Sequence, residues 1–158
     1  MNVSPGKTLN GRYQIISQLG QGGFGKTFLA EDRHLPGFPQ CVVKQFKPQE
    51  TDPDTLQTAR RLFNTEAEIL YQLGTHPQIP QLFAYFEENQ EFYLVQEYIE
   101  GHDLEQEIPL VPGAKNEDEV VRILQQILEI LAFVHQQKVI HRDVNPHNII
   151  RRNVDSIL

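Results

Sequence analysis

The sequence lacks the features that mark secreted or membrane-spanning chains. It has one cysteine, Cys41, among 158 residues, so an internal disulfide is impossible and a reducing compartment is favoured. No apolar run approaches the length that is needed to span a bilayer. The first ten residues are polar and lack the apolar core that a signal peptide has. We therefore expect a cytoplasmic protein with no membrane segment in this chain.

The sequence also lacks a basic stripe, an internal repeat and a low-complexity segment. Its 14 lysines and arginines stand against 21 aspartates and glutamates, a formal net charge of -7. That balance argues against nucleic-acid binding and favours a solvated acidic surface. Hydrophobic residues at 39% and charged residues at 22% are typical of a globular domain, and the length suffices for one core.

A polar segment near the end of the chain has the most specific pattern. Residues 141–148 read His-Arg-Asp-Val-Asn-Pro-His-Asn, after a long apolar stretch and a short turn. The carboxylate of Asp143 and the carboxamide of Asn148 can face one pocket from a tight loop. Asp143 could accept a proton from a hydroxyl, and the Asn148 oxygen could bind a hard cation such as Mg²⁺. The segment resembles the catalytic loop of protein kinases, His-Arg-Asp-x-x-x-x-Asn, at every defining position.

A zinc pair formed by His141 and His147 is the competing interpretation of this loop. Structural and catalytic zinc sites use three or four protein ligands. The sequence offers no further ligands at suitable spacing, so the kinase resemblance is favoured.

The beginning of the chain predicts a hairpin with a glycine-rich tip. Residues 13–19 and 26–30 are β-rich and flank Gly20-Gln21-Gly22-Gly23-Phe24-Gly25. Such a tip could be merely flexible, but its backbone can also approach a ligand and point amides at phosphate oxygens. In dinucleotide-binding folds a helix follows the pattern G-x-G-x-x-G, whereas here a strand follows. The segment is therefore similar to the glycine loop of kinases.

A strand lysine and a helix glutamate extend the resemblance. Residues 41–46 predict a third strand, on which a lysine is usually a solvated edge residue. By resemblance, Lys44 corresponds to the phosphate-binding lysine of kinases. Val42 occupies the position where the kinase pattern has alanine, and its larger side chain should narrow the adenine side of the ATP pocket. The pattern Glu66-Ala67-Glu68-Ile69-Leu70 is similar to the kinase αC helix and selects Glu66 over Glu68 as the partner of Lys44.

The helix that carries Glu66 is expected at Pro53–Leu73. Thr51-Asp52-Pro53 is a helix-start signal, and Gly74 is expected as the C′ residue that ends it. Apolar residues at helical spacing predict a buried face. That face consists of Leu62, Phe63, Ile69, Leu70 and Leu73.

A second hairpin leads into a segment that resembles the kinase hinge. Residues 82–87 and 91–99 predict two strands joined at 88–90, which completes five strands with one inserted helix. By the hinge resemblance, the Glu97 carbonyl and the Ile99 backbone would bind the adenine edge, and Asp103 would lie near the ribose hydroxyls. Gln96 would line the back of a small, partly polar pocket.

Residues 117–137 predict a long helix that is apolar around most of its circumference, as a core helix is. It resembles the αE helix that supports the kinase catalytic loop. Kinases continue with an Asp-Phe-Gly segment that holds Mg²⁺, and the sequence ends at Leu158 before any such segment. We therefore expect part of the apolar face of this helix to be exposed to solvent, and we expect the chain to self-associate through that face. We also expect little or no activity from the 158 residues alone.

One substitution within the catalytic loop sets this chain apart. Ser/Thr kinase loops usually carry lysine two residues after the aspartate, where it offsets the charge of the transferring phosphoryl group. Here that residue is Asn145, which can donate a hydrogen bond but supplies no charge. Pro146 still favours the Ser/Thr type of loop over the tyrosine type.

The resemblance implies an α+β, protein-kinase-like fold. Its parts would be a leader (1–11), an ATP-binding N-lobe with a five-stranded antiparallel sheet and the αC helix (12–99), and the first helices and catalytic loop of a C-lobe (100–158). The implied function is protein Ser/Thr kinase activity with ATP and Mg²⁺ and an unidentified protein substrate. The alternative is a pseudokinase or non-catalytic nucleotide- or protein-binding module.

The resemblance also implies a set of site residues. The catalytic set is Asp143, Lys44, Glu66 and Asn145, with Asn148 as the metal ligand. The ATP-binding set is Leu19, Gly20, Gln21, Gly22, Gly23, Phe24, Gly25, Thr27, Val42, Lys44, Gln96, Glu97, Ile99, Asp103 and Ile150.

Overall fold

The computed structural model describes residues 3–22, 25–48, 52–107 and 117–153. Within the chain, two compact units can be distinguished, Met1–Tyr98 and Ile99–Leu158. Each unit has its own secondary structure.

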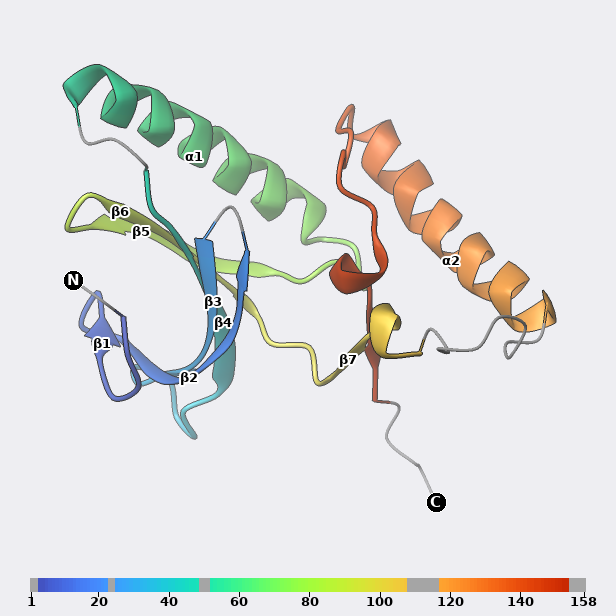
Figure 1. Cartoon of the computed structure of the whole chain (residues 1–158), viewed down its shortest axis with the longest axis horizontal. Helices are drawn as coiled ribbons and strands as arrows, with labels where there is room; N and C mark the ends of the chain where they lie inside the picture. The colour runs from blue at the N-terminus through green and yellow to red at the C-terminus, as the bar shows by residue number, and fades with distance from the viewer. Residues whose placement is uncertain (1–2, 23–24, 49–51, 108–116, 154–158) are drawn as a thin grey trace. The chain divides into compact units, whose positions relative to one another are not determined.

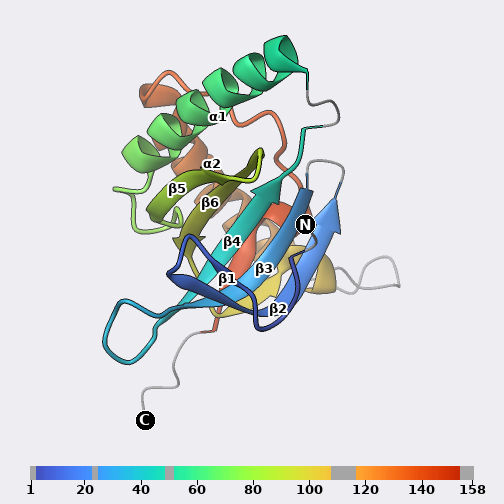
Figure 2. The ribbon, with the colours of Figure 1, turned by 90° about the vertical axis from the view of Figure 1, so that its left-hand side faces the viewer.

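The first unit is a curled antiparallel sheet with one α-helix on it (Figures 1 and 2). The strands run in the order β1-β2-β3-β4-β6-β5. Their bounds are β1 (Thr8–Leu9), β2 (Tyr13–Gly22), β3 (Gly25–Asp32), β4 (Gln40–Phe46), β5 (Leu82–Glu88) and β6 (Glu91–Glu97). The predicted antiparallel N-lobe sheet is confirmed, with six strands in place of five.

The sixth strand comes from the segment expected to be a loose leader, and that expectation is wrong for residues 3–11. β1 pairs with β2, with Thr8 opposite Gln14 and Leu9 opposite Tyr13. Leu9 is fully buried and Val3 nearly so. The burial of these two apolar side chains, roughly 1.5–3 kcal/mol each, is what fixes the segment on the sheet.

The sheet buries a hydrophobic cluster on each face. One cluster lies under the N-terminal segment and contains Leu9, Tyr13, Phe28, Val43 and Val95, among others. The other lies under the helix and contains Phe63, Ala67, Leu82, Phe92 and Leu94. Alternate residues of β4 and β6 contribute to opposite clusters, as the two-residue period of a strand requires.

The predicted helix is present as α1 (Pro53–Leu73). It begins at Asp52, whose carboxylate accepts a hydrogen bond of 3.0 Å from the Thr55 amide. Phe63 faces the sheet, with its ring centroid 5.0 Å from that of Phe92. Leu62, expected on the buried face, is 60% exposed, because it precedes Phe63 by one residue and so lies about 100° around the helix.

Gly74 ends α1 for a different reason from the one expected. Its φ of -65° is not the left-handed conformation of a C′ glycine. Instead, a Cβ there would lie 3.2 Å from both the Gln81 Cα and the Leu70 carbonyl oxygen. Glycine makes room here for the backbone that returns close to the end of the helix.

A two-residue turn joins β5 to β6. Asn89 and Gln90 have φ values of 55° and 62°, and Glu88 pairs with Glu91 across the turn. Two successive positive φ values are typical of a type I′ hairpin turn, which matches the twist of the flanking strands.

The second unit combines one long helix with a short two-stranded ribbon. Its elements are β7 (Gly101–Asp103), η1 (Leu104–Glu107), α2 (Glu117–Gln136), η2 (Pro146–Asn148) and β8 (Ile150–Arg152). β7 and β8 pair antiparallel. β8 follows the candidate catalytic-loop residues 141–148 in the chain, and β7 is labelled in Figure 1.

The helix α2 is not a buried core helix within this chain. Of its residues only Val134 is buried, while Val120, Val121, Leu124 and Leu128 are 41–63% exposed. The described residues of this unit provide no second α-helix to cover that face. The expectation that part of this helix is bare is met. Neither α1 nor α2 is long and apolar enough to cross a membrane among the residues described.

Candidate active site

The glycine-rich tip is narrower than the sequence predicts. Pairing between β2 and β3 continues to Gly22 opposite Gly25, so strand structure replaces most of the expected turn. Gly23 and Phe24 lie outside the described residues. A Cβ at Gly20 or Gly22 would meet no atom of the described residues within 4 Å. No contact within the described part of the chain therefore requires glycine at these two positions, which leaves close approach by an external group as a reason for it.

Gly25, by contrast, is required by the fold itself. Its φ is 144°, and a Cβ there would lie 1.9 Å from the Gln45 carbonyl oxygen of β4. Any other residue would push β3 away from β4 at this point.

Four candidate nucleotide-binding side chains share one face of the sheet. Thr27 lies opposite Lys44 across β3 and β4, and Val42 lies opposite Gln96 across β4 and β6. Directly opposed residues share a face, and Lys44 is two residues from Val42 on the same strand. It is the face on which α1 packs. Gln96 is buried there, and Leu19 is exposed on β2.

Lys44 and Glu66 influence each other without direct contact. Glu66 lies on α1 between the buried residues Phe63 and Ala67. Loss of water lowers the pKa of the Lys44 ammonium, and the Glu66 carboxylate partly offsets this. Loss of water likewise raises the pKa of Glu66, partly offset by Lys44. Both residues are nevertheless exposed, and within the described ranges 25–48 and 52–107 no ion pair of 4.0 Å or less joins their side chains.

The catalytic-loop candidates converge on one carboxylate in the second unit. Asp143 Oδ1 accepts a hydrogen bond of 2.8 Å from Asn145 Nδ2, and Asp143 Oδ2 accepts one of 2.8 Å from Asn148 Nδ2. Asn148 Nδ2 also donates to the Asp143 carbonyl at 2.9 Å. The carboxylate is thereby held from both sides and remains exposed.

The oxygen atoms of the two amides are left for other partners. Asn145 Oδ1 is buried and has no hydrogen-bond partner in the described part of the chain. Among the described residues, the side-chain hydrogen bonds of Asn148 are both donated by its nitrogen, which leaves its Oδ1 for other partners. Amide and carboxylate oxygens are the donor set that Mg²⁺ prefers, and the residues present therefore fit that ion.

A turn in the backbone immediately precedes Asp143 in this loop. Arg142 has a φ of 64°, an uncommon value for a residue other than glycine or asparagine, and the chain turns there just before Asp143. The Asp143 amide donates to His141 Nδ1 at 3.3 Å. Among the described residues no group of three histidine, cysteine or acidic side chains is placed to hold a metal ion.

The remaining hinge candidates occupy the end of β6 and the ribbon. Glu97 ends β6, where its amide donates to the Gln81 carbonyl at 2.8 Å. Ile99 begins the second unit. Asp103 lies opposite Ile150 in the β7–β8 ribbon, and Asp103 Oδ1 accepts from the Gln106 amide at 3.1 Å.

A polar cluster beside the ribbon had no counterpart in the sequence predictions. Glu107 bonds to His102 and, across 44 residues of sequence, to Arg151. No motif or periodicity signals this contact, because only the pairing of β7 with β8 brings the residues together.

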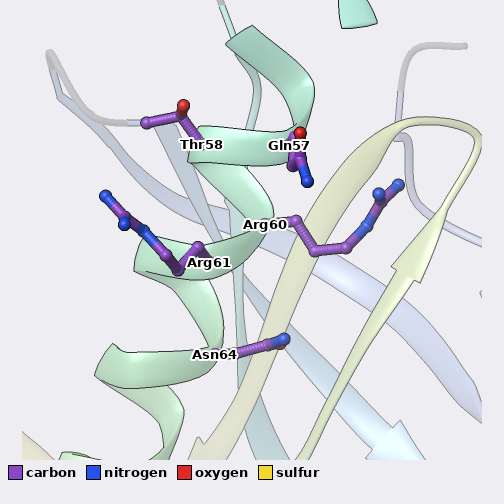
Figure 3. A pocket seen from close by; sticks show the side chains of 5 residues that line it. All are labelled: Gln57, Thr58, Arg60, Arg61 and Asn64. Atoms are coloured by element: carbon purple, nitrogen blue, oxygen red, sulfur yellow. The ribbon is translucent and has the colours of Figure 1, made fainter. Parts of the chain in front are cut away.

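The outer surface of α1 carries a shallow depression lined by Gln57, Thr58, Arg60, Arg61 and Asn64. Arg60 and Arg61 point to opposite sides of the helix (Figure 3). Arg60 already binds Glu87 at 2.7 and 2.9 Å. These side chains do not converge, so we assign no site to this surface.

Comparison with known proteins shows the family to which this chain belongs. The protein kinase domain family matches residues 13–157. The chain is 53% identical over 150 residues to serine/threonine-protein kinase B of Synechocystis sp. and covers 95% of itself and 26% of that protein. It is 49% identical over 154 residues to serine/threonine-protein kinase C of the same organism, with coverages of 97% and 29%. The chain thus spans less than a third of these relatives.

A solved structure shares the fold. The kinase domain of Mycobacterium tuberculosis PknI has a TM-score of 0.75 and 27% sequence identity to this chain. The match covers 96% of this chain and 60% of the PknI chain.

Proposed function

This chain belongs to the serine/threonine protein kinase family, and we propose that it is the ATP-binding and catalytic-loop part of an enzyme that phosphorylates protein hydroxyl groups. The substrate would be a protein serine or threonine, and the phosphoryl donor would be ATP with Mg²⁺. The observation that carries the proposal is the fixed Asp143 carboxylate, which Asn145 and Asn148 orient by hydrogen bonds.

In this proposal Asp143 orients the substrate hydroxyl and accepts its proton. A carboxylate that is exposed but held at both oxygens keeps one orientation, which is what a general base requires. Its lone pairs that are not used by the two amides remain available for the hydroxyl.

Lys44 and the glycine-rich hairpin would bind the phosphates. The Lys44 ammonium can form a charge-assisted hydrogen bond to a phosphate oxygen, and its exposed side chain is accessible to such a ligand. Gly20 and Gly22 leave room for the phosphates at the backbone amides. Glu66 would orient Lys44 once the ligand draws the two charges together.

The Asn148 oxygen would hold Mg²⁺, which supplies charge neutralisation of the transferring phosphoryl group. Gln96 and Val42 would line the adenine side of the site on the sheet. Glu97 and Ile99 would offer backbone groups to the adenine edge, and Asp103 would bind the ribose.

The second candidate function is a pseudokinase or other non-catalytic module that binds nucleotide or a protein. The observation that favours it is Asn145, which occupies the position of the usual lysine and brings no positive charge to the transferring phosphoryl group. This alternative keeps the binding residues and removes only the transfer step.

Thermal unfolding of the chain with and without Mg-ATP tests the nucleotide site. Ligand at a hundredfold over its Kd stabilises the folded state by about 2.7 kcal/mol, which corresponds to about 5–11 °C for this size. We expect Lys44→Ala to abolish the shift and Asp143→Asn to retain it. A cooperative transition without any shift would argue against ATP as the ligand.

Phosphotransfer then separates the two candidates. If the kinase proposal is correct, the whole protein should transfer phosphate to a generic protein substrate, and the Asp143→Asn variant should not. Nucleotide binding together with no phosphate transfer would favour the non-catalytic module.

A further inference from the structure

The β7–β8 ribbon joins two candidate ligand positions. His102 lies opposite Arg151, and Asp103 lies opposite Ile150. Asn148, the candidate metal ligand, stands two residues before Ile150. The register of this ribbon therefore sets where Asp103 lies relative to Asn148.

Backbone pairing alone is a weak means of fixing that register. The Leu104 amide donates to the Ile149 carbonyl at 2.9 Å, and the Asn153 amide donates to the Glu100 carbonyl at 2.9 Å. With strands of three residues each, such a ribbon is marginally stable in water without side-chain support.

The Glu107 carboxylate supplies that support from η1. It accepts a hydrogen bond of 2.7 Å from His102 Nε2 and one of 2.9 Å from Arg151 Nη2, and it also accepts from Arg151 Nε. One carboxylate thus bonds to both members of a cross-strand pair. The arginine contact is bidentate, the geometry that gives the strongest charge-assisted pairs.

Burial distinguishes Glu107 from its neighbour Glu105. The Glu107 side chain is 16% exposed, and its removal would leave His102 and Arg151 without their shared acceptor. Glu105 pairs with His147, but these side chains are 48% and 67% exposed. Exposed pairs contribute little, because water and salt screen them.

We infer that Glu107 is a positioning residue. Through His102 and Arg151 it fixes β7 against β8, and so sets the place of Asp103, the candidate ribose contact, relative to Asn148, the candidate Mg²⁺ ligand. The inference rests on the proposed nucleotide-binding function for these two roles. It does not require Glu107 to touch the ligand.

The test compares Glu107→Gln with Glu105→Gln, which removes the same charge from the same 3₁₀ helix. ATP affinity is measured with Mg²⁺ and with EDTA. We expect Glu107→Gln to reduce the gain in affinity from Mg²⁺ by about tenfold, which corresponds to about 1.4 kcal/mol, and Glu105→Gln to change it less than about twofold. Arg151→Lys should resemble Glu107→Gln, because lysine cannot bind both carboxylate oxygens in a fork.

Hydrogen exchange provides a second readout that needs no nucleotide. Glu107→Gln should accelerate exchange of the amides of Leu104, Asn148 and Asn153, while amides of the β2–β6 sheet stay as in the wild type. Unchanged loop exchange with an unchanged Mg²⁺ effect would overturn the inference, as would equal effects of Glu105→Gln. A wild-type chain that binds no ATP would instead refute the proposed function, and the exchange comparison would still decide whether Glu107 orders the loop.

Discussion

The side-chain amide of Asn145 lies 2.8 Å from Asp143 Oδ1 and donates a hydrogen bond to it. In the serine/threonine kinase loops that this segment resembles, the corresponding residue is usually lysine. An amide can reproduce the hydrogen bond of a lysine to the carboxylate, but it cannot reproduce its charge. Orientation of the base and stabilisation of the transferring phosphoryl group are therefore separable in this chain.

Asn145→Lys tests that separation. If the proposed phosphotransfer is correct, the added ammonium should stabilise the developing charge and raise kcat by about tenfold. The KM for ATP should stay nearly constant, because the effect is confined to the transition state. Steady-state kinetics of the whole protein measures both. Asn145→Ala, which removes the hydrogen bond without adding charge, should lower kcat; a kcat that Asn145→Lys does not raise would contradict this account.

Asp32 should make the fold sensitive to acid. The hydrogen bond from Arg12 lowers the pKa of the Asp32 carboxyl below its ordinary value of 3.8, despite its burial. A lowered pKa stabilises the folded state above the ordinary value, and this contribution is lost as the pH falls through the folded-state pKa. Asp32→Asn should lower the free energy of unfolding by about 1–3 kcal/mol at neutral pH. It should also reduce the further loss of stability that the wild type shows below about pH 4.

Urea unfolding at pH values from 7 to about 3 measures the effect of Asp32→Asn. Glu31→Gln is the matched control, since Glu31 pairs with Arg33 at the surface and both side chains are at least 33% exposed. Parallel pH profiles for the wild type and Asp32→Asn would show that the Arg12 contact is not the cause.

The N-terminal segment should contribute measurably to stability. Leu9 is fully buried against the sheet, so Leu9→Ala should reduce the free energy of unfolding by about 2–5 kcal/mol. Leu62→Ala makes the same change at a side chain that is 60% exposed, and should stay within about 0.5 kcal/mol of the wild type. Chemical denaturation compares the two. Equal losses would mean that residues 3–11 do not anchor on the sheet.

The hairpin turn between β5 and β6 offers a stabilising substitution. Gln90 has a φ of 62°, which glycine adopts without the steric strain of a side chain. Gln90→Gly should therefore raise the free energy of unfolding by about 0.5–1 kcal/mol. Gln57→Gly, within α1, should lower it by about 1 kcal/mol. Thermal unfolding of the two variants measures whether each substitution raises or lowers the stability. A destabilising Gln90→Gly would argue against the type I′ turn.

Self-association through α2 remains a prediction. Val120, Leu124 and Leu128 are exposed and spaced four residues apart, so they form one apolar stripe. Leu128→Glu should reduce the mass measured by light scattering toward that of one chain, 18.2 kDa. Gln125→Glu adds the same charge at a polar position and should leave the mass unchanged. A monomeric wild type at high concentration would rule this prediction out.

Where local signals act alone, the sequence predicted the structure closely. Asp52 and Pro53 begin the first helix as expected, because capping operates over a few residues, and the helix ends at the expected position although Gly74 is not left-handed. The catalytic-loop motif located Asp143 and Asn148 because their spacing is itself the signal. Leu62 was misplaced because neighbouring apolar residues on a helix cannot all face the same side.

The sequence by itself determined the family, five of the six strands of the sheet, the two long helices, and the candidate residues of the site. Those properties follow from short-range patterns of glycine, charge and hydrophobicity. Only the tertiary structure decided that residues 3–11 join the sheet, that Asn145 and Asn148 hold Asp143 from both sides, and that Glu107 meets Arg151. These contacts depend on long-range strand pairing and on side-chain directions, which no local pattern in the sequence specifies.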